Sequence, residues 1–73
     1  MRTVDLRGRR SPHPIIQIAK TIKKATPGET VNFLVDDRES IDEVYDWVRR
    51  TGHVLKGIAS KGDYWSVLIT KRK

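Results

Sequence analysis

Ser11 is the residue of this chain whose type and setting could support chemistry. It follows Arg9 and Arg10 and begins the segment Ser-Pro-His-Pro at residues 11–14. Serine before proline is typical of a helix start, because the serine oxygen can accept a backbone N–H and the proline has none to leave unpaired. The positive end of a helix dipole stabilises an anion such as a thiolate. A serine hydroxyl, in contrast, is not appreciably ionised near neutral pH without an activating base.

The candidate bases and metal ligands are poorly placed for such a reaction. His13 lies two residues beyond Ser11, and residues two apart at a helix start do not face each other. His53 follows a glycine, and we expect it to hydrogen-bond to loop backbone rather than to act in catalysis. Asp36 and Asp37 are predicted to form a solvated loop. Two histidines and no cysteine give no metal-ligand spacing, so we expect neither a metal nor a cofactor.

Turn residues divide the first half of the chain into three predicted elements. Residues 3–6 alternate as a short strand, which a loop around Gly8 follows. A helix opens at residues 11–12 and stops at the Thr-Pro-Gly-Glu segment 26–29. Its apolar stripe recurs at steps of three and four residues, at Ile15, Ile18, Ala19 and Ile22. Residues 30–35 alternate as a strand, and Leu34 on the polar side predicts that this strand is central.

The second half of the chain has the pattern of one helix and a hairpin. Ser40 with Glu43 three residues later forms a capping-box pattern, which predicts a helix from Ser40 to the residue before Gly52. Its predicted inward residues are Ile41, Val44, Tyr45 and Val48. Residues 53–59 and 64–70 are predicted strands, joined by a turn at residues 60–63.

The predicted order of elements is β-α-β-α-β-β, which indicates an α+β fold. We expect a two-layer α/β sandwich, in which a mixed four-stranded sheet carries two helices on one face. The 73 residues allow one small domain, residues 1–73. No apolar run approaches the roughly 20 residues that span a bilayer. The start of the chain lacks the apolar segment of a signal peptide, so the cytoplasm is the expected location.

The charge of the chain is distributed unevenly. Residues 36–46 contain six acids and one arginine, a net charge of −5, whereas the whole chain carries +6, so the remaining residues carry +11. The basic residues gather at the first predicted strand, its loop and the first predicted helix, and again at the end of the chain. If they share a face, they form a surface for phosphate or an acidic protein. Trp47 is expected to be core or edge packing; if exposed, it would suit a protein partner.

The segment Val-Asp-Leu-Arg-Gly-Arg-Arg-Ser-Pro-His-Pro at residues 4–14 resembles the signature of the TusA/SirA/YedF sulfur-carrier family. That signature is apolar-Asp-x-x-Gly-x-x-Cys-Pro-x-Pro at the same spacing. Pro-Gly-Glu at residues 27–29, Asp-Asp at 36–37, Asp-Trp at 46–47 and Gly-His-Val at 52–54 also resemble family features. The resemblance implies a compact β-α-β-α-β-β sandwich that acts as a sulfur carrier, a transferase component, in sulfur relays such as tRNA thiolation.

The resemblance implies a site at the first helix start, with one departure from the family. The family cysteine, which carries sulfur as a persulfide, is replaced by Ser11, so we predict that this chain cannot carry sulfur. The flanking residues implied to bind a partner are Arg9, Arg10, Pro12, His13 and Pro14. The implied partners are sulfur-relay proteins, either a desulfurase or a downstream acceptor, and the implied state is a monomer. Whether this chain has any catalytic activity of its own is left open, and none is predicted.

Three interpretations of Ser11 stay open at this point. The serine is a deliberate replacement of a cysteine, or it belongs to a natural homologue that docks without transferring sulfur, or it supports new chemistry. A cysteine codon in the genome would decide for the first of these. An alternative function for the whole chain is a small basic nucleic-acid-binding module on the same fold, although few aromatic residues lie among the basic ones.

Overall fold

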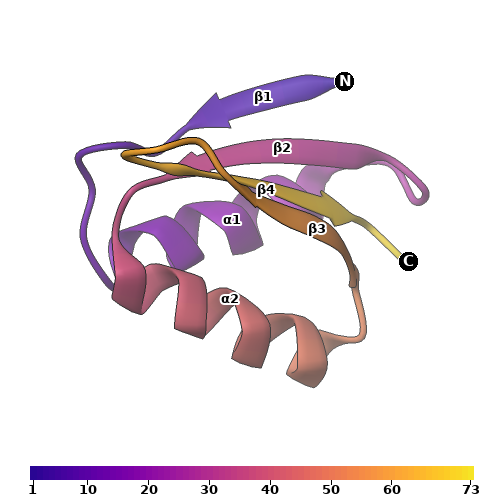
Figure 1. Ribbon diagram of the computed structural model, residues 1–73. Coiled ribbons are helices and arrows are strands. Elements are labelled where there is room, and N and C mark those ends of the chain that lie inside the picture. The colour runs from indigo at the N-terminus through magenta and orange to yellow at the C-terminus, as the bar shows by residue number, and fades with distance from the viewer.

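The computed structural model describes residues 1–73 and confirms the predicted order of elements. The strands and helices are β1 (Arg2–Asp5), α1 (His13–Lys24), β2 (Thr30–Val35), α2 (Arg38–Thr51), β3 (Val54–Ser60) and β4 (Trp65–Thr70). Both helices lie on one face of the four-stranded sheet, which makes the molecule a two-layer α+β sandwich as predicted (Figure 1). Neither helix is both long and apolar enough to span a membrane.

The sheet is mixed and has the strand order β1-β2-β4-β3. Strand β1 pairs with β2 in parallel, and β4 pairs with both β2 and β3 in antiparallel fashion. The predicted central position of β2 is therefore confirmed, because it lies between β1 and β4. The predicted hairpin is also confirmed, and its turn is closed by a hydrogen bond from the Lys61 N–H to the Tyr64 carbonyl at 2.8 Å.

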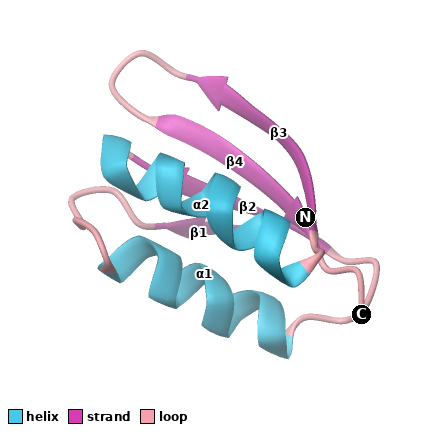
Figure 2. Cartoon of the chain, turned by 90° about the horizontal axis from the view of Figure 1, so that it is seen from below, coloured by secondary structure: helices cyan, strands magenta, loops and turns pink.

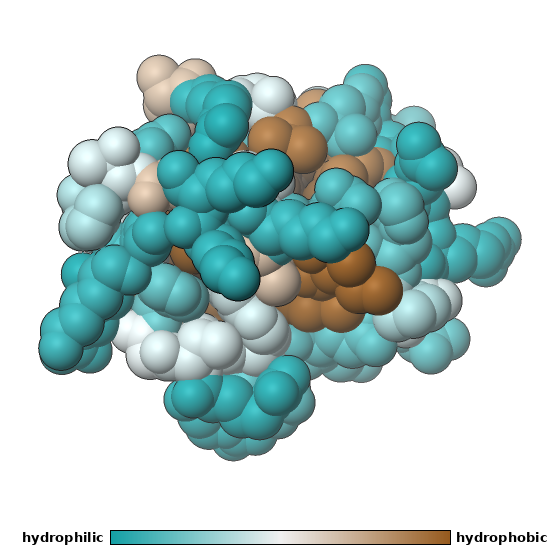
Figure 3. Space-filling view, turned by 180° about the vertical axis from the view of Figure 1, so that it is seen from behind, coloured by the Kyte–Doolittle hydropathy of each residue, from teal (hydrophilic) through white to brown (hydrophobic).

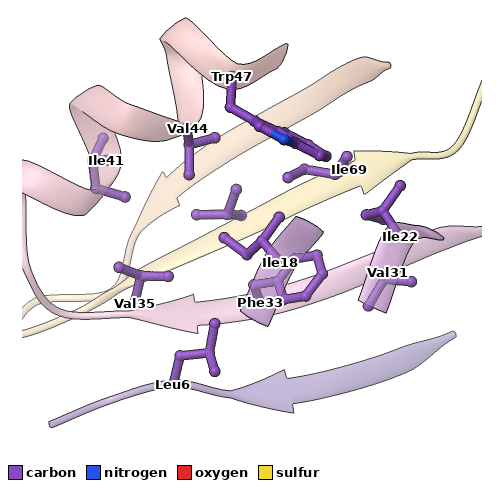
Figure 4. Packing of buried hydrophobic residues seen from close by; sticks show 11 residues of the cluster. Leu6, Ile18, Ile22, Val31, Phe33, Val35, Ile41, Val44, Trp47 and Ile69 are labelled. Atoms are coloured by element: carbon purple, nitrogen blue, oxygen red, sulfur yellow. The ribbon is translucent and has the colours of Figure 1, made fainter. Parts of the chain in front are cut away.

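The hydrophobic core fills the space between the sheet and the two helices (Figure 4). Phe33 on β2 is completely buried, as are Ile18 and Ile22 on α1. The prediction that Tyr45 points inward is wrong, since this side chain is 55% exposed. The buried stripe of α2 passes through Val44, and each helical residue is turned by about 100° from the one before it, so Tyr45 points to the side.

Both helices begin at other residues than predicted. Helix α1 begins at His13, because the His13 N–H bonds to the carbonyl of Arg10 at 2.8 Å. Helix α2 begins at Arg38 rather than at Ser40, because the Ser40 N–H already bonds to the Asp37 carbonyl at 3.1 Å. The predicted end of α2 is confirmed, since Gly52 has the left-handed φ of 82° that favours glycine after a helix.

The two helices run side by side in the same direction (Figure 2). Their first residues lie at the end of the molecule that also holds the loop between β1 and α1. Their last residues lie at the opposite end, near both chain termini (Figures 1 and 2). The molecule therefore has two ends: both helices start at one of them and finish at the other.

Candidate functional site

Ser11 lies two residues before α1 and is partly buried. The prediction that its side chain caps α1 is wrong, since α1 has no side-chain cap. The hydroxyl instead donates a hydrogen bond to Oε2 of Glu43 at 2.8 Å. Ser11 lies within a tight turn, residues 10–13, in which the Arg10 carbonyl accepts the His13 N–H. Its side chain is thereby directed across to α2 rather than along its own helix.

Glu43 is the site residue that the sequence did not reveal. The capping-box prediction assigned its carboxylate to the backbone of Ser40, but α2 begins one half-turn earlier, which leaves the carboxylate free to reach Ser11. Its second oxygen, Oε1, is buried and has no hydrogen-bond partner. The only sequence signal was that Ser40 and Glu43 share one side of the helix. Nothing in that spacing indicated which segment they face.

Two neighbouring aspartates of the predicted solvated loop also hold the loop that carries Ser11; Asp36 is exposed and Asp37 is partly buried. Asp36 accepts the Gly8 N–H at 3.0 Å. Asp37 accepts the Ser11 N–H and the Ser40 hydroxyl, both at 2.8 Å. The Ser11 N–H, followed by the Ser40 hydroxyl, holds the pKa of the Asp37 carboxyl below its usual range. The loop is thus fixed at two points.

Arg9 and Arg10 belong to this loop and are both exposed. Together with Gly8, Asp36 and Asp37 they line a shallow depression of about 180 Å³. The charge of Arg10 contributes to the lowered pKa of Asp37. The lining of the depression therefore combines guanidinium groups with carboxylates.

The residues after Ser11 differ in accessibility. Pro12 is exposed and His13 is partly buried, whereas Pro14 is fully buried. Pro14 therefore does not lie on the surface with the other predicted binding residues. It packs inside the first turn of α1, where it supports the position of the helix start.

The end of β1 is held to the hairpin by Arg7. Its guanidinium forms two hydrogen bonds of 2.9 Å to Asp5, and it lies 4.9 Å from the centre of the Tyr64 ring. The hydrogen bonds from the Arg7 side chain and backbone lower the pKa of Asp5 to about 2. The charge of Arg7 is consequently engaged away from Ser11.

The opposite end of the molecule carries a second set of polar contacts. Trp47 is only 9% exposed and stacks on His53 with ring centres 5.4 Å apart, so it is no exposed anchor for a partner. His53 Nδ1 accepts the N–H of Arg72 at 3.1 Å, which confirms its predicted structural hydrogen bond to backbone. Thr51, Gly52, His53, Arg72 and Lys73 line an open pocket of about 440 Å³.

The basic residues do not form one patch. The Nζ of Lys71 donates to the carbonyls of Lys23 and Ala25, both at 2.8 Å, which ties the C-terminal segment to the finish of α1. The last turns of α1 and α2 and the C-terminal segment carry seven basic residues, which we call the basic end: Lys23, Lys24, Arg49, Arg50, Lys71, Arg72 and Lys73. Arg9 and Arg10 precede the start of α1, and its 12 residues span about 18 Å. They are therefore remote from the basic end.

The site thus combines a helix start, the Ser11 hydroxyl and the Glu43 carboxylate, which accepts a hydrogen bond from that hydroxyl. No group of three or more His, Asp or Glu side chains is arranged to hold a metal ion. A carboxylate alone activates a serine weakly, because it is a much weaker base than an alkoxide. Glu43 is an acceptor for the Ser11 hydroxyl that sequence analysis did not predict. No residue orients the Glu43 carboxylate in turn, since its Oε1 has no hydrogen-bond partner.

Comparison with known proteins decides the family. The family model described as "Sulfurtransferase TusA" matches residues 2–71. This chain belongs to the TusA family. A candidate sulfur carrier protein of Archaeoglobus fulgidus is 36% identical over 73 residues, which cover all of both chains. The resemblance drawn from residues 4–14 is thereby confirmed for nearly the full length.

The TusA fold is also seen in a solved structure. The SirA-like protein of Desulfitobacterium hafniense superposes with a TM-score of 0.82 over all of both chains, at 23% sequence identity. At that identity the likeness concerns the fold. In this fold Ser11 lies just before the start of α1.

Proposed function

We propose that this TusA family member docks onto sulfur-relay proteins without carrying sulfur itself. The observation that carries the proposal is the position of Ser11, which stands partly exposed at the start of α1 with an oxygen where the family signature has sulfur. The fastened loop, the exposed Arg9 and Arg10 and the exposed Pro12 support a retained docking surface around it. The 73 residues would act as one domain, in the cytoplasm.

The chemical argument concerns the nucleophile. In a sulfur relay, a cysteine thiolate attacks the outer sulfur of a donor persulfide, forms a new S–S bond and releases the donor as a thiolate. Ser11 would have to lose its proton and form an O–S bond instead. A serine hydroxyl is far less acidic than a thiol, and an alkoxide is not available near neutral pH without a strong base. This chain is therefore expected to accept no sulfur from a donor persulfide.

A competition experiment tests docking and the lack of transfer together. A cysteine-bearing TusA protein is loaded by a cysteine desulfurase and cysteine, with increasing amounts of this chain, and both proteins are weighed by intact mass spectrometry. We expect this chain to slow the loading of the cysteine-bearing protein several-fold while its own mass stays unchanged. No slowing at a large excess would contradict docking.

Matched variants locate the docking surface. Replacing both exposed arginines beside Ser11, in R9E/R10E, is expected to abolish the competition. The control K20E/K56E makes the same charge change at exposed lysines of α1 and β3 and is expected to compete like the unchanged protein. Equal losses in both variants would show that only net charge matters.

A second candidate function is nucleic-acid binding, which the basic end favours. Seven basic residues gather there, and the pocket beside them is lined by Arg72 and Lys73 with no hydrophobic residue. Asp46 is paired with Arg49 and Arg50, which leaves the other cations of this end without an acidic neighbour among the ion pairs. Phosphate groups of a backbone would supply that counter-charge. This function uses the end of the molecule opposite to Ser11, so the two candidates are separable.

A further inference from the structure

The Glu43 carboxylate contacts the Ser11 hydroxyl and therefore affects which side chain is favourable at position 11. The Ser11 hydroxyl gives its hydrogen to Glu43 Oε2 at 2.8 Å, and the Ser11 N–H gives its hydrogen to Asp37 at 2.8 Å. A hydroxyl suits this setting because it is neutral and has a hydrogen to donate. A thiolate has no hydrogen to donate and carries the same sign of charge as the carboxylate that faces it.

We propose that Glu43 determines the chemistry of position 11: it selects an uncharged hydrogen-bond donor there and opposes a thiolate. The inference deepens the proposed function and rests on it, since it identifies a second residue that keeps this member out of sulfur transfer. Ser11 and Glu43 are then a matched pair, and replacement of the serine alone does not restore a sulfur carrier.

Partial burial of the Glu43 side chain strengthens the effect. Glu43 Oε1 is out of contact with solvent and has no hydrogen-bond partner, and Glu43 takes part in none of the ion pairs of the structure. A buried charge is screened less by water and salt than an exposed one. A second anion at position 11 would meet a carboxylate that already lacks one acceptor interaction.

The remaining charged groups around position 11 do not cancel this carboxylate. These charged and titratable side chains come from the segment of Ser11 itself and from the turn after β2: Arg9, Arg10, His13, Asp36 and Asp37. The two arginines are exposed to water, and Arg10 acts on Asp37. Arg7 is held by Asp5 and Tyr64. The helix start favours an anion, but its field is spread over the first turn, whereas the Glu43 carboxylate stands in direct hydrogen-bond contact with position 11.

The reactivity of an introduced thiol tests the inference without any partner protein. The chain has no cysteine, so the thiol of the S11C variant is the only one present. The rate of alkylation by iodoacetamide is measured from pH 5 to pH 10 by intact mass spectrometry, and the midpoint gives the apparent pKa of that thiol. Three proteins are compared: S11C, S11C/E43Q and S11C/E39Q. The last makes the same charge change on an exposed glutamate of α2.

We expect the S11C midpoint to lie above the ordinary cysteine value of about 8.5. In S11C/E43Q the midpoint should fall by at least about one pH unit, because the glutamine amide is neutral and can donate to a thiolate. Alkylation at pH 7 should then be about tenfold faster than in S11C, whereas S11C/E39Q should resemble S11C. An S11C midpoint at or below the ordinary value, or equal shifts from E43Q and E39Q, would overturn the inference.

A second measurement uses the serine protein and does not depend on the S11C variant. If Ser11 and Glu43 are a pair, the melting temperature of S11A/E43A falls by less than the sum of the two single losses. Additive losses would contradict the pairing. Because neither measurement involves a desulfurase, failure of docking and failure of this inference give different results.

Discussion

At the scale of single residues, the carboxylates of Asp37 and Glu43 position Ser11. Asp37 holds the backbone of Ser11 and Glu43 holds its hydroxyl, each at 2.8 Å. Asp37 also accepts a hydrogen bond from the Ser40 hydroxyl and is only partly buried. Its role is to fix the turn rather than to bear a catalytic proton. The backbone and the hydroxyl of Ser11 are thereby both held in place.

The pH dependence of stability follows from the lowered pKa of Asp37. A carboxyl with a folded pKa below its unfolded value of about 3.9 contributes stability that is present above that value and is lost as pH falls through the folded one. We expect the melting temperature to fall below about pH 4, and D37N to flatten part of this fall while lowering stability at pH 7. Melting curves between pH 2 and 7 check this. An unchanged acid profile in D37N would refute the assignment.

The Asp5 carboxyl offers an independent comparison at the same scale. Its pKa is lowered to about 2 by Arg7, so its contribution is lost as the pH falls toward that value. The R7Q variant is expected to return the Asp5 pKa toward its ordinary value, which NMR titration of the side-chain carboxyl resonance would follow. An Asp5 titration that stays near pH 2 in R7Q would show that another group causes the shift.

At the scale of elements, local patterns predicted what local interactions determine. The alternation of residues 30–35 and the stripe through Ile18 and Ile22 predicted β2 and α1, because burial on one face imposes these periods. The starts of both helices were misplaced, since backbone carbonyls of Arg10 and Asp37 accept the first N–H groups. A serine in the sequence cannot reveal that such an acceptor exists nearby.

The contact between Ser11 and Glu43 could not be predicted for a related reason. It joins two helix starts that are far apart in sequence, and it depends on the relative placement of α1 and α2 against the sheet. The sequence indicated the motif and the type of chemistry at residue 11. The charge that faces residue 11 is a property of the packing.

The finish of α2 gives a test of an element boundary. Gly52 has a left-handed φ of 82°, so G52A is expected to destabilise the protein by about 1 kcal/mol. Gly57 has no positive φ, and an added Cβ there would meet nothing within 4 Å, so G57A should change stability by less than about 0.5 kcal/mol. Chemical denaturation compares the two. Equal effects of both substitutions would contradict the boundary.

At the scale of the whole molecule, the residues behind the two candidate functions lie at opposite ends. The helix starts hold Ser11 with its carboxylates and the exposed arginines, whereas the helix finishes and the C-terminal segment form the basic end. One side of the molecule is largely hydrophilic and shows hydrophobic side chains only in separate areas (Figure 3). Charge rather than an apolar surface is therefore the more apparent means of recognition on that side.

The basic end predicts a salt-dependent affinity for nucleic acid. Binding of a fluorescent RNA duplex, followed by anisotropy, should weaken steeply between about 50 and 200 mM salt, as counterion release requires. K23E/K24E should weaken binding about tenfold or more at low salt, while K20E/K56E should have a smaller effect. No binding of RNA or DNA at low salt would exclude this second function and leave docking unaffected.

The sulfur-loading reaction tests the central claim most directly. This chain is incubated with a cysteine desulfurase and cysteine, beside a cysteine-bearing TusA protein as the positive control, and intact masses are measured before and after addition of a reductant. We predict that the control gains one sulfur atom that the reductant removes, and that this chain keeps its original mass. A reductant-sensitive gain of one sulfur atom on this chain would contradict the account.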